Sequence, residues 1–219
     1  MLTRRAAIFQ TGAAATAAIS ARAVPAKAVP AKAAVGIQGR EVGWRGLLPD
    51  GWFGGNAAHI EEVIRDPQFE IIRKPMEWLL SRAKNIDAAA FHPDASGIKS
   101  SQISLIQISD GSKLGVDIAD PKQRAEFWEK IRSILPEDAP AGSRTTLETQ
   151  PSAPMTGGFP AFAAVFRTDQ PNGSWSFALF HCVDRGPARM HSFELSADQI
   201  KFPARRQEFD TMLRSVRYV

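Results

Sequence analysis

Two histidines in neighbouring apolar segments are the side chains of this sequence best suited to bind a metal ion. His181 lies in the run FALFHCV and His191 in the run MHSFEL, with the turn-forming sequence DRGP between them. A hairpin turning about Gly186 places His181 opposite His191, where cross-strand Cβ atoms lie about 5 Å apart. Two imidazoles at that separation can share a zinc or copper ion. The alternative is a pair of hydrogen-bonded structural histidines, because no third ligand is evident and a register slip would separate the pair.

An aromatic-rich segment, WRGLLPDGWFGGN at residues 44–56, supplies a second group of candidate residues. Trp44, Trp52 and Phe53 lie there among glycines and a proline, and aromatic side chains in loops can anchor a protein partner. The same side chains can instead pack against the core and act as a strap. Mutation separates the two interpretations, because a core aromatic contributes stability whereas an anchor contributes binding.

Patterns typical of enzymes are absent from the sequence, which has no G-x-S-x-G, H-E-x-x-H or C-x-x-C motif and only four histidines. The single cysteine, Cys182, is expected to be a buried apolar residue, because reactive thiols need exposure and cationic surroundings. The glycine pairs at 54–55 and 157–158 lack the lysine and the spacing of phosphate-binding loops. We therefore expect a binding protein without a cofactor. A small metal-binding protein or enzyme built on the histidine pair is the alternative.

The amino-terminal residues have the layout of a bacterial export signal. Arg4 and Arg5 precede an uncharged, weakly apolar stretch at residues 6–19, and Ala-Arg-Ala at 21–23 fits the A-x-A cleavage rule. The stretch falls short of the roughly 20 strongly apolar residues that span a bilayer. We predict that the signal is removed and that the mature chain is not an integral membrane protein. Ala-Lys-Ala at 26–28 offers a second cleavage site.

The segment TRRAAI at residues 3–8 resembles the twin-arginine motif of signals that carry folded proteins across the bacterial inner membrane. Thr3 before the arginines and Ile8 after them fit that motif, whereas Ala7 occupies a position where the family usually has Phe. The resemblance implies the twin-arginine route to the periplasm. An ordinary secretory signal and an uncleaved anchor are the alternatives.

Composition divides the chain into three parts. Residues 1–23 are the expected signal, 24–40 an Ala-, Pro- and Lys-rich linker, and 41–219 one domain that can bury a core without disulfides. Five of the 27 Lys and Arg residues and none of the 23 Asp and Glu residues lie before residue 36, so 22 basic and 23 acidic residues remain. This near balance argues against nucleic-acid binding.

The elements that must position the candidate residues follow from hydrophobic periodicity. Helices are expected after Asn56 and over 75–85, 121–135 and 203–219, and strands over 69–73, 86–93, 159–169, 173–186 and 188–197, with a further pair of strands within 101–120. Asp110-Gly111 should join two of these strands in a hairpin. In the clearest helix, Asp120 is the expected cap, Gln123 reaches back as in a capping box, and the buried stripe is Phe127, Trp128, Ile131, Ile134 and Leu135.

Strands in runs joined by short turns favour an α+β fold, an antiparallel sheet with helices on both faces, over a parallel doubly wound fold. From about Phe69 to Val219 the order of elements, with a closing F-x-x-M-L-x-S-V motif, resembles the PsbP-like family. That resemblance implies a single α/β/α sandwich domain of the kind found in the photosynthetic lumen and in bacterial envelopes. It also implies non-enzymatic work, with a protein partner in a larger envelope complex. No functional residue is transferred from the family.

Overall fold

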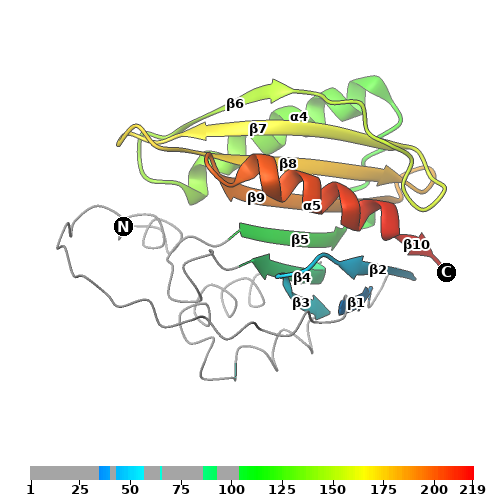
Figure 1. Cartoon of the computed structure of the whole chain (residues 1–219). Helices are drawn as coiled ribbons and strands as arrows, with labels where there is room; N and C mark the ends of the chain where they lie inside the picture. Colours follow the sequence, from blue (N-terminus) through cyan, green and yellow to red (C-terminus); the bar gives the residue numbers. More distant parts are fainter. Residues whose placement is uncertain (1–34, 40–42, 57–64, 66–85, 93–103) are drawn as a thin grey trace, which may run out of the picture.

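The computed structural model describes residues 35–39, 43–56, 65, 86–92 and 104–219. These residues form two antiparallel sheets, and one helix lies on each face of the larger sheet (Figure 1). The expected signal, the helix after Asn56, the strand at 69–73 and the helix at 75–85 lie outside the described residues. Among the described residues, no helix has the length and apolar character needed to cross a membrane.

Seven strands make the larger sheet, in the order β3-β4-β5-β9-β8-β7-β6, and every neighbouring pair is antiparallel. The strands are β3 (Phe53–Asn56), β4 (Ile86–His92), β5 (Ser104–Asp110), β6 (Arg144–Thr149), β7 (Ala161–Asp169), β8 (Trp175–Asp184) and β9 (Met190–Asp198). The long apolar runs predicted as strands are thus confirmed as β7, β8 and β9. Their alternate residues point to opposite faces, so both faces need cover.

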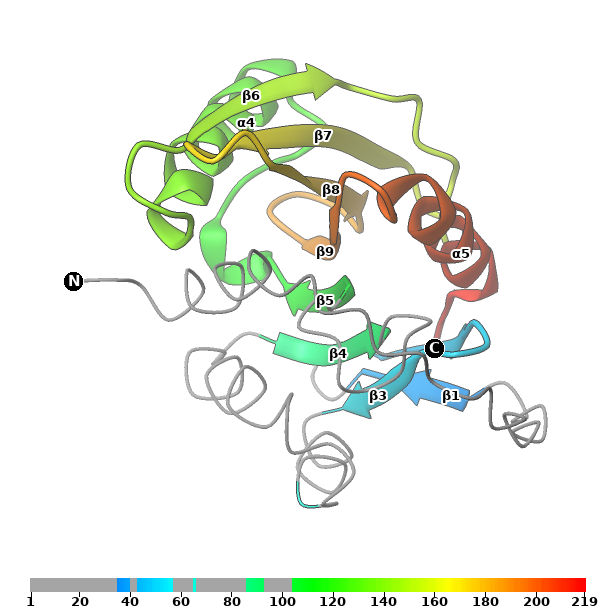
Figure 2. The same ribbon diagram turned by 60° about the vertical axis from the view of Figure 1, so that its left-hand side comes forward.

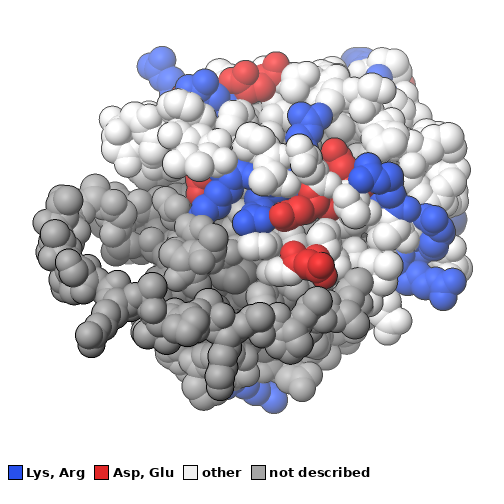
Figure 3. Space-filling model, in the orientation of Figure 1, with Lys and Arg blue, Asp and Glu red and all other residues white. Residues whose placement is uncertain are grey.

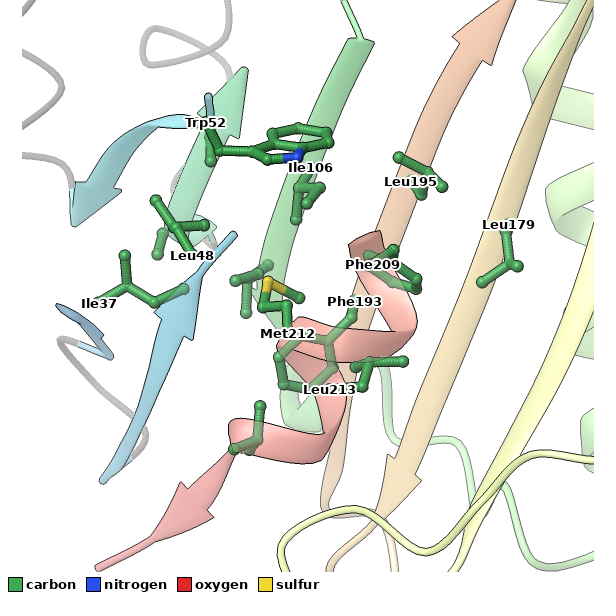
Figure 4. Close-up of a cluster of buried hydrophobic side chains, with 14 of the residues drawn as sticks. Ile37, Leu48, Trp52, Ile106, Leu179, Phe193, Leu195, Phe209, Met212 and Leu213 are labelled. Atoms are coloured by element: carbon green, nitrogen blue, oxygen red, sulfur yellow. The ribbon is translucent and has the colours of Figure 1, made fainter. Parts of the chain in front are cut away.

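Helices α4 (Pro121–Ile134) and α5 (Phe202–Ser215) supply that cover, one on each side of the sheet (Figure 2). Phe127, Trp128 and Ile131 of α4 pack in one core with side chains of β7 and β8. On the other face, Phe209, Met212 and Leu213 of α5 point toward β9, where Phe193 and Leu195 lie (Figure 4). The predicted α+β sandwich with helices on both faces is confirmed.

A smaller sheet, in the order β1-β2-β10, packs at the α5 side of the molecule. Its strands are β1 (Val35–Gln38), β2 (Trp44–Leu48) and β10 (Arg217–Tyr218). Strand β1 lies inside the segment 24–40 that composition assigned to the linker. Its Ile37 is 3% exposed in the α5-side core, so folded structure begins before residue 41.

The hairpin expected at Asp110-Gly111 is wrong. Strand β5 ends at Asp110, whose side chain accepts a hydrogen bond from the Ser112 backbone N–H and starts a 3-10 turn, η3 (Ser112–Leu114). Gly111 has φ −84°, not the positive value that a tight hairpin turn requires, and the positive φ of 64° falls at Gly115. The chain therefore leaves the sheet, and β5 pairs with β4 and β9.

The predicted start of α4 is confirmed, but two details are wrong. Asp120 accepts hydrogen bonds from the backbone N–H groups of Lys122 and Gln123, at 2.8 and 2.9 Å. Gln123 does not reach back to the cap and instead accepts a bond from the Asp117 N–H at 3.0 Å. Ile134 is 41% exposed because α4 ends there and continues as the 3-10 helix η4 (Leu135–Asp138).

Candidate functional site

The two candidate histidines lie on the α5 side of the sheet, but they do not face each other. His181 of β8 pairs with Phe193, and His191 of β9 pairs with Val183. The expected register is therefore wrong by two residues, because the turn is centred on Pro187 rather than Gly186. A shift of two residues keeps both side chains on one face, as diagonal neighbours.

His181 fastens the turn at residues 156–159 to the sheet. Its side chain is 2% exposed, and its Nε2 is hydrogen-bonded to Thr156 Oγ1 at 2.8 Å. In that turn Gly157 and Gly158 both have positive φ, and the Thr156 and Phe159 backbones bond to each other. Burial lowers the pKa of His181 to about 4, so the imidazole is neutral near pH 7.

His191 fastens the carboxyl-terminal strand β10 in the same way. Its side chain is fully buried, and its Nδ1 is hydrogen-bonded to the Tyr218 hydroxyl at 2.8 Å. Burial is the main cause that lowers its pKa to about 3; the Arg185 charge lowers it further and the Asp110 charge opposes this. Burial also raises the pKa of Tyr218, so the phenol stays protonated.

A buried carboxylate lies beside this bond. Asp87 is 2% exposed and accepts a hydrogen bond of 2.6 Å from Trp44 Nε1. Its Oδ2 lies 3.9 Å from His191 Nε2, too far for a hydrogen bond, and that nitrogen has no hydrogen-bond partner. A neutral His191 makes no ion pair with Asp87, so β4, β2, β9 and β10 are joined here by the Trp44–Asp87 and His191–Tyr218 hydrogen bonds and by packing.

In the described part of the chain, both histidines have a structural role. Each uses one ring nitrogen to hold a segment from outside the hairpin. Within the described residues, no group of three or more His, Cys, Asp or Glu side chains could hold a metal ion. The metal site at His181 and His191 stays a prediction from the sequence. Cys182 is buried as expected, and burial raises its thiol pKa, which opposes nucleophilic chemistry.

The aromatic segment at residues 44–56 packs Trp44 and Trp52 against the core, which is the arrangement that the strap interpretation describes. Trp44 and Trp52 are 1% and 3% exposed and belong to the α5-side core. Trp52 Nε1 donates a hydrogen bond of 2.8 Å to Glu208 of α5, which ties this segment to the helix. Phe53 stacks on Phe91 of the neighbouring strand and is the partly exposed member of the three. A partner-binding role for these side chains stays a prediction.

One candidate surface was missed from the sequence. The outer face of the smaller sheet carries Gly36, Arg45, Leu47 and Arg217, all of them exposed. The alternation of buried and exposed residues along β2 is a period-two signal that could have identified Arg45 and Leu47 as a pair on one face. Nothing local reveals that Arg217 lies beside them, because β10 is two residues long and pairs with a distant strand.

Comparison with known proteins supports the fold and leaves the sequence family open. No protein-family model matches the chain, and no curated protein sequence matches it. Among solved structures, cyanobacterial PsbP (CyanoP) from Synechocystis sp. PCC 6803 is similar, with a TM-score of 0.51 and 12% sequence identity. The similarity covers 90% of this chain and 98% of that one. The chain therefore has a PsbP-like fold.

Proposed function

We propose that this chain is an exported protein of the bacterial periplasm that binds, as an accessory or assembly factor, to a larger complex of the cell envelope. The similarity in fold to cyanobacterial PsbP over most of both chains is the observation that carries the proposal. The export-signal layout of residues 1–23 supports the location, and the TRRAAI segment supports the twin-arginine route.

The chemistry of the candidate residues supports binding over catalysis. His181 and His191 are held neutral by burial, and each is hydrogen-bonded to another segment of the chain. A general base needs a pKa near the working pH and access to substrate. Neither imidazole has these properties. A metal-binding protein or enzyme built on this pair is the alternative function, and metal titration distinguishes it.

The test follows the protein in its own host. Envelopes are gently solubilised and separated on a density gradient, and the chain is detected by antibody beside purified mature protein. We expect a periplasmic chain that begins near Val24 or Val29, with a fraction that sediments with a larger assembly. A chain that stays in the cytoplasm, or that sediments as the free protein in every gradient, would overturn the proposal.

A double variant that keeps the charge of the signal tests the export route. Replacing both arginines, Arg4→Lys with Arg5→Lys, keeps the charge of the signal but removes the twin-arginine pair. We expect this variant to accumulate unprocessed in the cytoplasm. Normal processing of the variant would assign the signal to the ordinary secretory route, because that route requires positive charge but not a specific arginine pair.

A further inference from the structure

The outer face of the smaller sheet concentrates positive charge. Arg45 of β2 and Arg217 of β10 are directly opposite each other in the antiparallel pair, and both are exposed. Arg214, exposed in the last turn of α5, comes three residues before Arg217 and is linked to it by a bond from Arg217 Nη1 to its carbonyl oxygen at 2.9 Å. Like charges directly opposite on two strands destabilise the pair. An anion between them would relieve that repulsion.

These three arginines have no carboxylate partner of their own among the described residues. Arg214 donates to the Thr211 hydroxyl, and Arg217 donates to backbone carbonyls at the end of α5. Burial is the main cause that raises the pKa of Asp210 in α5, and the charges of Arg206 and Arg214 oppose that rise. Asp210 is a single acidic residue near two arginines, so it does not neutralise the face. Arg45 and Arg217 can therefore bind a carboxylate of another molecule.

The concentration of charge is local. The chain after residue 35 has 22 basic and 23 acidic residues, so it carries no general excess of positive charge. Figure 3 shows a run of Lys and Arg side chains at the right of the view, where β10 and the end of α5 lie, without an acidic side chain inside the run. Such a patch attracts and orients an acidic partner.

An apolar contact lies beside the arginines. Leu47 is 49% exposed on the same outward side of β2 as Arg45. Its cross-strand partner is Gly36, and a Cβ placed there would meet nothing within 4 Å. The face thus combines an exposed leucine, a glycine with open space where a side chain would be, and guanidinium groups that can bind carboxylates in a bidentate manner.

We propose that the outer face of the smaller sheet (Gly36, Arg45, Leu47 and Arg217), together with Arg214 at the adjoining end of α5, docks an acidic segment of the partner protein, with an apolar side chain of that segment against Leu47. The proposal rests on the proposed function, since it names the surface through which the binding occurs. A protein segment is favoured over an anionic membrane, because a single exposed leucine offers little surface for insertion between lipids. Fixed carboxylates also match the geometry of the opposed guanidinium groups.

The experiment uses the mature chain and a fluorescent peptide of alternating Glu and Leu, with a Gln-for-Glu peptide as the neutral probe. Fluorescence anisotropy gives the affinity at about 50 and about 300 mM salt, where screening differs strongly. The test variant is Arg45→Glu with Arg217→Glu. The control is Lys122→Glu with Lys130→Glu, an equal change of charge on the exposed side of α4. Vesicles with and without phosphatidylglycerol serve as the lipid probe.

We expect the Glu peptide to bind the wild type more tightly than the neutral peptide does, with an affinity that falls at high salt. The test variant should lose at least about tenfold in affinity, and the control variant less than about twofold. Leu47→Ala should weaken binding but leave the dependence on salt unchanged. Equal losses in the test and control variants, binding of both peptides alike, or a preference for anionic vesicles would each overturn the proposal. A protein that sediments with an envelope complex but fails this test would retain the proposed function and lose this docking surface.

Discussion

Acid should destabilise the protein chiefly through its two buried histidines. His181 and His191 have folded-state pKa values of about 4 and about 3, against an ordinary value of 6.5. As the pH falls below 6.5, the two histidines become protonated in the unfolded chain but stay neutral in the folded chain. The free energy of unfolding is therefore greatest near neutral pH and declines as the pH approaches the folded-state values.

The size of the effect follows from those values. Between about pH 7.5 and about pH 4.5, each histidine lowers the free energy of unfolding by about 2–3 kcal/mol, and the two together by about 5 kcal/mol. That loss is comparable to the whole stability of many domains. Burial is the main cause of the low His191 pKa; the Arg185 charge lowers it further and the Asp110 charge raises it, while the Asp87 carboxyl faces the ring at 3.9 Å from Nε2. The Arg185 and Asp110 charges act in opposite directions, and burial is the largest cause.

The assay is urea unfolding followed by tryptophan fluorescence at both pH values, for the wild type and for His181→Gln with His191→Asn. These amides can replace the bonds from Nε2 and Nδ1 but do not titrate in this range. We expect the double variant to lose about 5 kcal/mol less than the wild type on acidification, and each single variant to recover about half of that. Equal losses in the wild type and the double variant would refute buried, neutral histidines.

Three further predictions concern side chains on the α5 side of the sheet. Tyr218→Phe removes the bond to His191 and should lower the free energy of unfolding by about 1–2 kcal/mol in urea titrations; no change would show that β10 is held by packing alone. Trp52→Ala should cost about 3–5 kcal/mol in the same assay, because the indole is buried, whereas Phe53→Ala should cost less; the reverse order would contradict the strap. In calorimetric titration with zinc, wild type and His181→Ala should show equal, weak binding, and a loss of tight binding in the variant would establish the predicted metal site.

Elements with strong local signals were predictable. Strands β7, β8 and β9 are long apolar runs, and α4 begins with a cap at Asp120 and a proline, both readable from neighbouring letters. Strand β6 was missed because five of its six residues are exposed, which leaves no hydrophobic alternation to detect. The register of the β8-β9 hairpin was predicted wrongly because the residues between the strands allow a turn centred on either Gly186 or Pro187. Glycine favours tight turns, so Gly186 was taken as the centre.

Contacts between distant segments could not be predicted, and the candidate sites depend on them. The sequence identified His181 and His191 as unusual, and they do lie on one face of the sheet. Their actual partners, Thr156 and Tyr218, come from a turn and a two-residue strand whose positions only the folded chain reveals.

Strand β10 connects the interior of this end of the molecule to its surface. Tyr218 points to His191 through its hydroxyl, while its neighbour Arg217 faces outward opposite Arg45. Because residues alternate across a strand, the buried bond that holds β10 also fixes Arg217 on the outer face. Loss of that bond in Tyr218→Phe should therefore weaken binding of the acidic peptide. The effect should be larger than that of an equally destabilising substitution on the α4 side, such as Ile131→Val, which shortens a buried side chain. Equal effects of the two variants on peptide binding would show that the buried hydrogen bond does not position the docking face.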